Sequence, residues 1–460
     1  MIRIYDTKSR SLGSPPASGQ VRIYACGPTV YRDVHLGNLR SFLLPDLIRL
    51  ALAAHDSDSF IVQNITDVGH MADDSNLDTS DSTEDKMLKQ AAAEKLSALE
   101  IARKYELGFF QDITALNIRT PDQTPRASET IESMIDVIQK LMDKGFAYQG
   151  ENGSVYFDAT KYESYGAISG NTLEQLKPGH RLLDEIDETK RFHGDWALWK
   201  ITDNRRSELT WQTPWGVGFP GWHIECTAMC LDAFGDQVDI HTGGIDLRFP
   251  HHENERAQSN AIVGKEVVGQ WVHAEHLLFE GRKMSKSTNN VVLLRDVIDA
   301  GISPAAVRLA FLEHHYRQQL NLTWDTLVAA ETTIARWSDS IVSDQYNHAI
   351  SDQITEHLAD NLDTPTAIMA IRGLEKSLAK SPKERSMMLN AASRMLGLDL
   401  AKPKLVIDDS VIKLVQEREI ARANKDFNLS DQLRDQITTA GYWVNDTSSG
   451  PVIRRSIKLP

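Results

Sequence analysis

The sequence predicts an α/β fold built on a parallel sheet, and three stretches near its start support that prediction. A strand-like run at 21–25 is followed by a loop and then by helical periodicity that continues through Leu52. A second strand-like run follows at 59–65. Two strands joined by one helix form a β-α-β unit, in which the strands are parallel. Pro45 lies inside the helical stretch, where the loss of one backbone donor should kink or locally loosen the helix.

Residues 73–86 interrupt this pattern with six acidic residues and one lysine, and we interpret them as a solvated, mobile loop. Helices are then predicted at about 84–115 and 128–144. The second has Ser128 as its expected N-cap and Gly145 as its C-terminal stop.

The periodicity of the remaining chain changes several times. A strand signal at 153–158 opens a stretch to about residue 200 whose mixed signals indicate an insertion. Strand and loop signals return from Trp211 to Leu294. Helical periods dominate 302–395 and predict a helical bundle, after which Pro403 marks a linker.

The composition is that of a folded protein long enough for about three folding units. Hydrophobic residues make up 41% of the 460 residues and charged residues 25%. Three cysteines are too few for a disulfide framework and fit a reducing compartment, so we expect a cytoplasmic protein. The N-terminus has no apolar run of signal-peptide length, and no uncharged stretch of about 18 residues occurs. We therefore expect neither secretion nor a membrane partner.

The charge is unevenly distributed along the chain. The formal net charge is −14, so a nucleic-acid partner would need local basic surface. Residues 411–460 hold eight Lys and Arg against six Asp and Glu, which gives +2 there and −16 in the remaining 410 residues. The C-terminal segment thus differs electrostatically from the rest of the chain.

Metal-capable side chains gather in three separated segments. Cys26 ends the first predicted strand, Cys226 ends the hexapeptide GWHIEC, and residues 250–255 read PHHENE. Two thiolates, imidazoles and a carboxylate suit Zn²⁺. No CxxC pair occurs, so the spacing alone leaves both a metal site and a purely structural role open. Cys230, four residues after Cys226, is equally explained as a small buried hydrophobe.

Two short motifs carry groups suited to phosphate. HLGN (His35–Asn38) opens the first predicted helix, where backbone N–H groups and the positive helix end bind phosphates. KMSKS (Lys283–Ser287) places two ammonium groups and two hydroxyls on a loop, where they would stabilise charge on a triphosphate. Taken alone, the first is more simply a histidine near a helix N-cap, and the second an exposed basic turn.

Together, these motifs resemble the two signatures of class I aminoacyl-tRNA synthetases. Between them, CGPTVY, NITD, GWHIEC and HTGGIDLRFPHHENE occur in the order seen in the cysteinyl-tRNA synthetase family. The segment from Ala421 to the end of the chain resembles that family's anticodon-binding region, so the resemblance covers essentially the whole sequence.

The resemblance implies a Rossmann-like parallel-sheet catalytic domain with an inserted connective region, followed by an α-helical bundle and a small C-terminal anticodon-binding domain. The expected ranges are 1–118 and 205–300 for the two halves of the catalytic domain, 119–204 for the insertion, 301–402 for the bundle and 403–460 for the anticodon-binding domain.

The resemblance also implies a zinc site at the base of an amino-acid pocket, with one ion per chain. The expected ligands are Cys26, Cys226, His251 and Glu255. The expected substrate contacts are Thr66, Trp222, His241 and Asp246. A substrate thiolate binds zinc far better than a serine hydroxyl does, so no editing domain is expected. We expect His252 and Glu253 to support the site by hydrogen bonds.

The implied reaction is the activation of L-cysteine by ATP to cysteinyl-adenylate, followed by transfer to the 3′-terminal ribose of tRNA(Cys). The expected catalytic residues are His35, Asn38, Lys283 and Lys286. The expected ATP-binding residues are His35, Gly37, Asn38 and Lys286, with Mg²⁺ on the pyrophosphate. The expected anticodon readers are Arg422, Asp431 and Asp446. We expect a monomer.

Two departures from the family pattern and two alternative functions remain. Asn38 replaces the last histidine of the HIGH consensus, and Thr288-Asn289 follows KMSKS where the family often has Leu-Gly. One alternative is a cysteine ligase that transfers cysteine to an amino-sugar, as in mycothiol biosynthesis, although such ligases lack this C-terminal tail. The other is a non-catalytic RNA-binding relative, which the intact motifs and four zinc positions disfavour.

Overall fold

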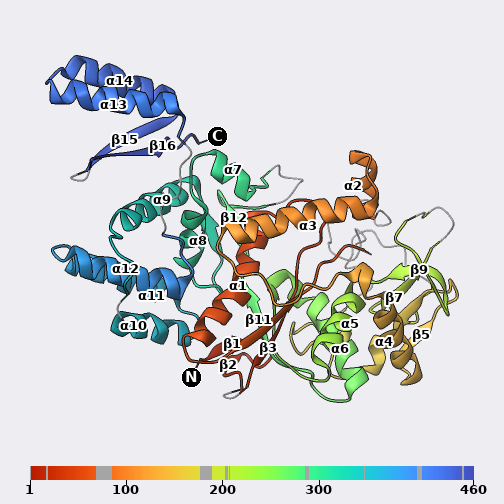
Figure 1. Ribbon diagram of the computed structural model, residues 1–460. Coiled ribbons are helices and arrows are strands. Elements are labelled where there is room, and N and C mark those ends of the chain that lie inside the picture. Colours follow the sequence, from red (N-terminus) through yellow and green to blue (C-terminus); the bar gives the residue numbers. More distant parts are fainter. Residues whose placement is uncertain are drawn as a thin grey trace.

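The structure is a computed structural model whose elements are labelled in Figure 1. It describes residues 2–16, 19–68, 85–176, 189–202, 206, 208–284, 290–346, 348–400, 407–447 and 450–459. The acidic loop predicted at 73–86 lies outside the described residues apart from Asp85 and Lys86, as does the linker predicted at Pro403. The N-terminal segment forms a hairpin of β1 (Ile4–Asp6) and β2 (Ser11–Gly13).

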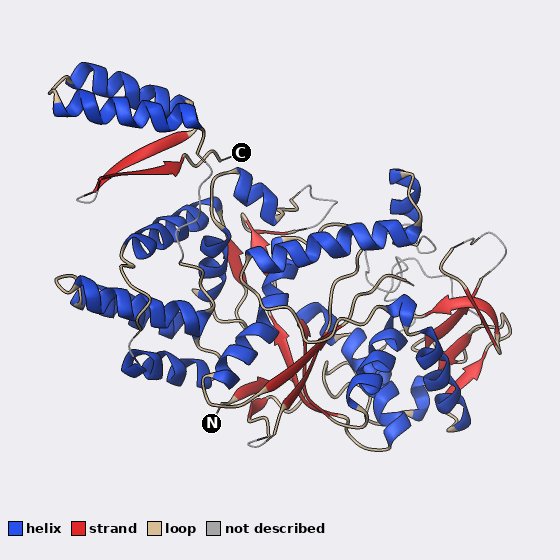
Figure 2. Ribbon diagram, in the orientation of Figure 1, coloured by secondary structure: helices blue, strands red, loops and turns tan. Residues whose placement is uncertain are grey.

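A four-stranded parallel sheet forms the centre of the molecule, with the order β11-β10-β3-β4 (Figure 2). Its strands are β3 (Val21–Ala25), β4 (Ser59–Gln63), β10 (Val238–Gly244) and β11 (Val268–Ala274). The α/β class with a parallel sheet is thus confirmed. Because β3 pairs with β4 on one side and with β10 on the other, the strand order reverses between β3 and β10. Open α/β sheets bind ligands at such a reversal.

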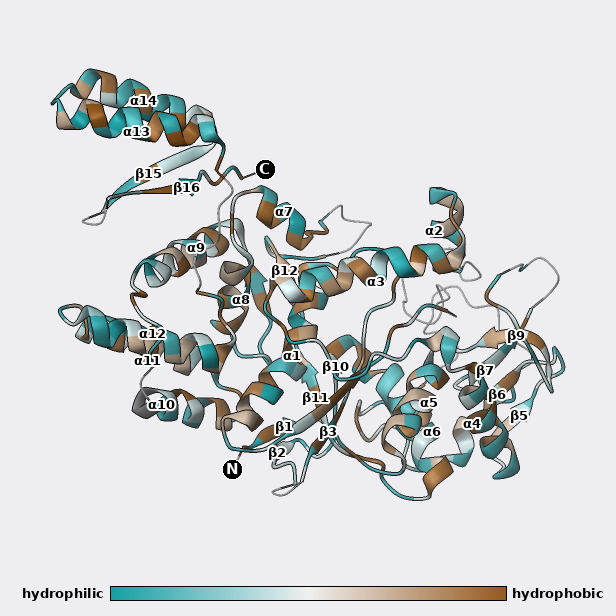
Figure 3. Cartoon of the chain, in the orientation of Figure 1, coloured by the Kyte–Doolittle hydropathy of each residue, from teal (hydrophilic) through white to brown (hydrophobic). Residues whose placement is uncertain are grey.

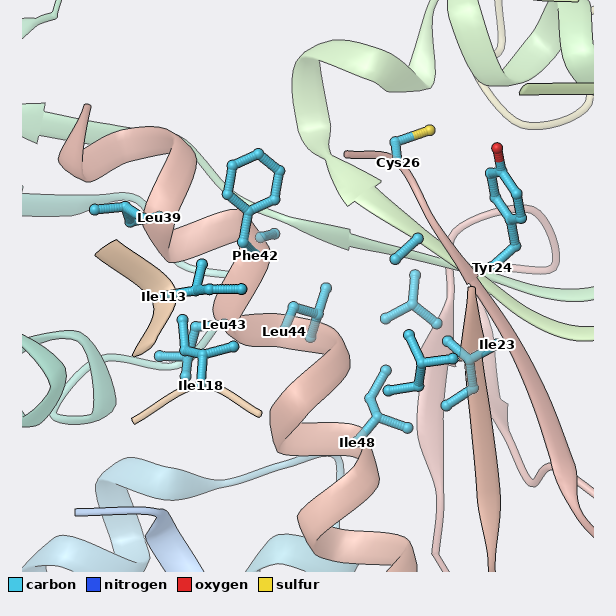
Figure 4. Packing of buried hydrophobic residues seen from close by; sticks show 14 of the residues in the cluster. Ile23, Tyr24, Cys26, Leu39, Phe42, Leu43, Leu44, Ile48, Ile113 and Ile118 are labelled. Atoms are coloured by element: carbon cyan, nitrogen blue, oxygen red, sulfur yellow. The ribbon is translucent and has the colours of Figure 1, made fainter. Parts of the chain in front are cut away.

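Helix α1 (Leu36–Ala53) starts at the HLGN motif and packs against this sheet. Figure 4 shows Leu44 and Ile48 of α1 facing Ile23 of β3. The helix is buried on almost every side, because α3 and the helical region cover it from the other face. Figure 3 colours stretches of α1 brown, in keeping with its many buried apolar residues. Pro45 lies inside the helix, as predicted.

Two expected helices differ in detail from the prediction. The helix predicted at 84–115 is two helices, α2 (Lys86–Glu94) and α3 (Ala98–Ala115), because Lys95 takes a left-handed conformation with φ 57°. The helix predicted at 128–144 is α4 (Ile131–Asp143), and its N-cap is Thr130. The prediction of Ser128 as the N-cap is therefore wrong. Its hydroxyl donates instead to the buried Asp67 carboxylate at 2.6 Å.

The middle of the chain forms a second, antiparallel sheet with the order β5-β6-β7-β9-β8. The bounds are β5 (Ala147–Gln149), β6 (Val155–Phe157), β7 (Trp196–Ile201), β8 (Trp211–Thr213) and β9 (Gly216–Pro220). β6 is the strand predicted at 153–158. Short 3-10 helices are η1 (Ala127–Glu129), η2 (Ala159–Lys161), η3 (Leu173–Gln175) and η4 (Ile245–Arg248). The chain returns to the central sheet through α5 (Trp222–Phe234) and α6 (His251–Val263).

Helices dominate after β11, as predicted for 302–395. They are α7 (Leu294–Asp299), α8 (Pro304–Leu312), α9 (Trp324–Asp339), α10 (His348–Ala359), α11 (Thr364–Ser377) and α12 (Pro382–Leu396). A small sheet of β12 (Leu277–Phe279), β13 (Arg282–Lys283) and β14 (Leu320–Leu322) lies between this region and α1 of the central α/β unit.

The last described residues form a small C-terminal module with its own core. Its elements are α13 (Asp409–Ala423), α14 (Phe427–Thr439), β15 (Tyr442–Thr447) and β16 (Gly450–Arg455). Val411, Val415 and Ile437 are buried between them. Within the described ranges, every helix is too short or too polar to cross a membrane.

Candidate active site

Polar side chains converge at the carboxyl edge of the central sheet, between β3 and β10. Cys26 directly follows β3, and His241 lies on β10 opposite Tyr24, so both reach the same edge. Cys226 comes from α5. His251 and Glu255 are one turn apart on α6 and therefore share one helix face.

The four expected zinc ligands lie together. One ligand atom from each of Cys26, Cys226, His251 and Glu255 lies within 4.8 Å of all the others, and all four residues are buried. His251 Nε2 lies 2.8 Å from Glu255 Oε1, and Cys26 Sγ lies 3.8 Å from the same oxygen. Two sulfurs, one imidazole nitrogen and one carboxylate oxygen form a donor set that suits Zn²⁺. The residues present therefore fit the metal.

Cys26 and Glu255 also belong to a second possible ligand set, completed by His241 and His252. The Nε2 atoms of His241 and His252 lie 3.6 and 3.3 Å from Cys26 Sγ. His252 is thus close enough to be a ligand itself, and its supporting role stays a prediction. Glu253 points away from this cluster, because its carboxylate accepts hydrogen bonds from the backbone N–H groups of 168–169.

A chain of histidines behind the ligands was not predicted from the sequence. His252 Nδ1 lies 2.8 Å from His273 Nε2, and His273 Nδ1 lies 2.8 Å from the Thr7 hydroxyl. On the other side, His223 Nδ1 lies 2.9 Å from His251 Nδ1. The available signal was the polar residue His273 in β11, a mostly apolar strand that also contains Gln270.

Burial and neighbouring charges set the protonation of this cluster. Burial lowers the pKa of His241 and of His273 to about 3, so both rings are neutral. Burial opposes the charge on His251, but the carboxylate of Glu255 and the thiolate of Cys226 raise its pKa to about 10. A hydrogen bond from Cys26 lowers the pKa of Cys226 to about 6. Burial raises the pKa of the Cys26 thiol. Cys226 is thus largely a thiolate at neutral pH, whereas binding of a divalent cation would displace a proton from His251 and from Cys26.

The expected substrate contacts differ in their burial and in their contacts with the ligand cluster. Trp222 stacks on His251, with ring centroids 4.1 Å apart. Thr66 is buried, and its hydroxyl accepts a hydrogen bond from Asn64 Nδ2 at 3.0 Å. Asp246 lies on η4 with its side chain exposed. Gly243 leaves room for the His252 ring, since a Cβ there would lie 2.7 Å from His252 Cε1.

The HLGN motif caps α1 with its own side chains. The backbone N–H of Asn38 donates to His35 Nδ1, and the side-chain oxygen Oδ1 of Asn38 accepts from the backbone N–H of His35, both at 3.3 Å. Because Nδ1 accepts, the proton of the neutral ring is on Nε2, which leaves one donor for a phosphate. Burial lowers the pKa of His35 to about 4 and keeps the ring neutral. A Cβ on Gly37 would lie 3.1 Å from Met284 Cε, so glycine permits this packing.

One of the two signature lysines lies within the described residues. Lys283 is exposed at the end of β13. Lys286 lies outside the described residues. Met284, between them, is buried.

The structure brings together two of the three expected anticodon readers. Arg422 Nη1 and Asp446 Oδ1 lie 2.5 Å apart. The buried Arg418 donates two further hydrogen bonds to Asp446, each of 2.9 Å, which lowers the pKa of that carboxyl. Asp431 lies on α14, exposed, with Arg434 as its ion-pair partner at 3.5 Å.

Comparisons with known proteins show which family the chain is similar to. Residues 13–332 match the family described as tRNA synthetases class I (C) catalytic domain. A cysteine–tRNA ligase from Thermus thermophilus is 37% identical over 97% of this chain and 98% of its own length. The chain belongs to the cysteine–tRNA ligase family. Relatives of the same name from Protochlamydia amoebophila and Treponema denticola are 34% and 35% identical, over 99% and 94% of the chain and 98% and 94% of their own lengths.

Solved structures support the same fold at low sequence identity. The ternary complex of Agrobacterium radiobacter LeuRS, tRNA and LeuAMS superposes with a TM-score of 0.56 at 11% identity and covers 83% of each chain. Mycobacterium tuberculosis methionyl-tRNA synthetase with methionyl-adenylate gives a TM-score of 0.50 at 15% identity, over 90% of this chain and 88% of the other. The class I synthetase fold expected from HLGN and KMSKS is confirmed.

Proposed function

We propose that this chain activates L-cysteine with ATP to cysteinyl-adenylate and transfers the cysteinyl group to the 3′-terminal ribose of tRNA(Cys). The observation that carries the proposal is the buried set of two thiols, an imidazole and a carboxylate at the sheet edge where α/β folds bind ligands. Membership of the cysteine–tRNA ligase family, over nearly the full chain, supports it.

Cys26, Cys226, His251 and Glu255 would hold one zinc ion in this proposal. When bound, the ion supplies a site with strong preference for a thiolate over a hydroxyl. Trp222 lies against the His251 ring and closes an apolar side of the space that a small substrate side chain would occupy. The exposed carboxylate of Asp246 suits the substrate ammonium.

The adenylation step needs no protein nucleophile. A carboxylate oxygen of cysteine attacks the α-phosphorus of ATP, the bond from that phosphorus to the bridging oxygen breaks, and pyrophosphate leaves. His35 can donate from Nε2 to a phosphate oxygen while its Nδ1 caps the helix. Lys283 and Lys286, with Mg²⁺ on the pyrophosphate, are proposed to neutralise charge during this displacement.

We propose that the C-terminal module reads the tRNA anticodon with Arg422, Asp431 and Asp446. An arginine fork and carboxylates suit the edges of bases. Arg422 and Asp446 already form an ion pair, so each is held in place before a base arrives. The three cysteines are free, and the cytoplasm stays our expectation for where the enzyme works.

The decisive experiment is cysteine-dependent exchange between ATP and pyrophosphate, measured without tRNA. We expect exchange with cysteine and none above background with serine. A protein that exchanges equally with both amino acids, or with neither, does not have the proposed activity. Charging of tRNA(Cys), compared with transfer to an amino-sugar, then separates the ligase from the remaining cysteine-activating alternative.

The role of Lys286 is testable with a matched lysine. We expect Lys286→Ala to lower the rate of exchange strongly and to leave the KM for cysteine nearly unchanged, because the ammonium acts on charge present mainly in the transition state. Lys265→Ala is the control, since that exposed lysine pairs with Asp236 at the surface. Equal rates in both variants would exclude the proposed role.

A further inference from the structure

The chain end returns from the C-terminal module to the catalytic side of the molecule. Figure 1 shows the C-terminus beside α7. The N–H of Ser456 donates to the Gly441 carbonyl oxygen inside the module at 2.9 Å. The N–H of Lys458 donates to the Ala300 carbonyl oxygen, just after α7, also at 2.9 Å. We call Ser456–Lys458 the tail segment, because it bonds to both parts through its backbone.

The contact between the tail segment and the end of α7 is close. Gly301 has φ +91°, and a Cβ there would lie 2.8 Å from the Ser456 carbonyl oxygen and 3.4 Å from Ile457 Cα. The side chain of Ile457 packs against the main hydrophobic core, whereas Leu459 is 45% exposed. The tail segment is therefore held in place by backbone contacts and by the packing of one apolar side chain.

An ion pair further fixes the module. Arg454, at the end of β16, pairs with Asp339 at the end of α9. The module is thus held on the rest of the chain by a charge pair at the end of α9 and by the tail segment just after α7.

The residues just before α7 contact the HLGN motif. The N–H of Leu36 donates to the Val292 carbonyl oxygen at 3.1 Å, next to a single antiparallel bridge between His35 and Leu293. Arg295 Nη1 lies 2.8 Å from Asp33 Oδ2 in the loop before the motif. The short helix between these contacts is anchored in the core by Leu294 and Val297, which are fully buried. The residues that flank α7 therefore contact the start of α1 on one side and the tail segment on the other.

We propose that the tail segment positions the adenylation site. Its docking on Ala300 and Gly301 fixes α7, and α7 fixes His35 and Leu36 at the start of α1. The inference rests on the proposed function, because it concerns ATP bound at HLGN. Binding equilibria at linked sites are reciprocal, so tRNA held by the C-terminal module strengthens ATP binding to the extent that it favours the docked tail.

The test uses two neighbouring aliphatic residues in the full-length protein. Ile457→Ala removes the seated side chain, and Leu459→Ala is the matched control because its side chain is exposed. Exchange between ATP and pyrophosphate is measured without tRNA. We expect Ile457→Ala to raise the KM for ATP about threefold or more, as loss of a partly buried aliphatic side chain allows, and to leave the KM for cysteine unchanged. Leu459→Ala should match the parent.

A backbone variant makes the test independent of side-chain packing. Lys458→Pro removes the N–H that donates to Ala300 and should raise the KM for ATP in the same way. The inference is overturned if Ile457→Ala and Lys458→Pro both keep the parent KM for ATP, or if the KM for cysteine rises equally, as general destabilisation would cause. A parent protein without cysteine-dependent exchange would instead refute the proposed function.

Discussion

Arg308 is the buried cation that joins the catalytic side to the helical region, and Arg308→Met should destabilise the protein strongly. Its side chain is 1% exposed and forms an ion pair of 2.8 Å with Asp46 of α1. It also donates to the carbonyl oxygens of Leu396, Leu116 and Asn117 at 2.9, 3.0 and 2.7 Å. Methionine fills similar space but satisfies none of these acceptors.

The expected magnitude follows from the buried partner. Removing one member of a buried ion pair costs about 3–5 kcal/mol, because the other charge is left without compensation. For a cooperative unit of about 150–250 residues, that corresponds to a fall in the melting temperature of roughly 6–20 °C. Arg336→Met is the control, since Arg336 is 52% exposed in its pair with Glu375 and such pairs contribute up to about 1 kcal/mol.

Thermal unfolding, monitored by circular dichroism, compares the stability of Arg308→Met with that of Arg336→Met. The reasoning is refuted if Arg308→Met melts within about 2 °C of Arg336→Met. A double variant, Asp46→Leu with Arg308→Met, should recover part of the loss, because it removes the uncompensated carboxylate.

Two further predictions concern the pH dependence of stability and the KM for cysteine. Burial, and to a smaller extent the charge of Asp33, raises the pKa of Asp112 to about 6. The stability that the protonated carboxyl contributes is therefore fully present below its unfolded pKa of about 4 and is lost as the pH rises through about 6. Above pH 6, Asp112→Asn should therefore raise the free energy of unfolding by about 1–2 kcal/mol relative to the parent, after allowance for partial exposure of the carboxyl. This gain should vanish below about pH 4. A gain that does not depend on pH would contradict this cause. Gly243→Ala should raise the KM for cysteine several-fold with little change in the KM for ATP, because its Cβ would displace the His252 ring; unchanged exchange kinetics would show that the ring position is unimportant.

Features encoded in short stretches of sequence were predictable. The strand predicted at 21–25 is β3, and the cap at His35 sits at the end of the following loop, because both depend on local patterns. The strand predicted at 59–65 ends at Gln63 in β4, within the usual uncertainty of strand ends. The proximity of the four expected ligands followed from the family resemblance, since they come from three separate segments.

Features that depend on tertiary contacts were not predictable. The bond between His252 and His273 requires the register of β10 on β11, which places Gly243 opposite His273. Ser128 looked like an N-cap, but the long-range acceptor Asp67 takes its hydroxyl. The contact of the tail segment with Ala300 likewise joins residues far apart in the sequence, so no local pattern indicates it.

The most direct test of the proposed metal site is the zinc content of three purified proteins, measured by elemental analysis. Cys226 and Cys230 lie one turn apart on α5 and are both buried, yet among the described residues only Cys226 of this pair belongs to a possible ligand set. We predict about one zinc per chain in the parent and in Cys230→Ala, and its loss from Cys226→Ala. Full zinc occupancy in Cys226→Ala, or equal loss from both variants, would contradict the site.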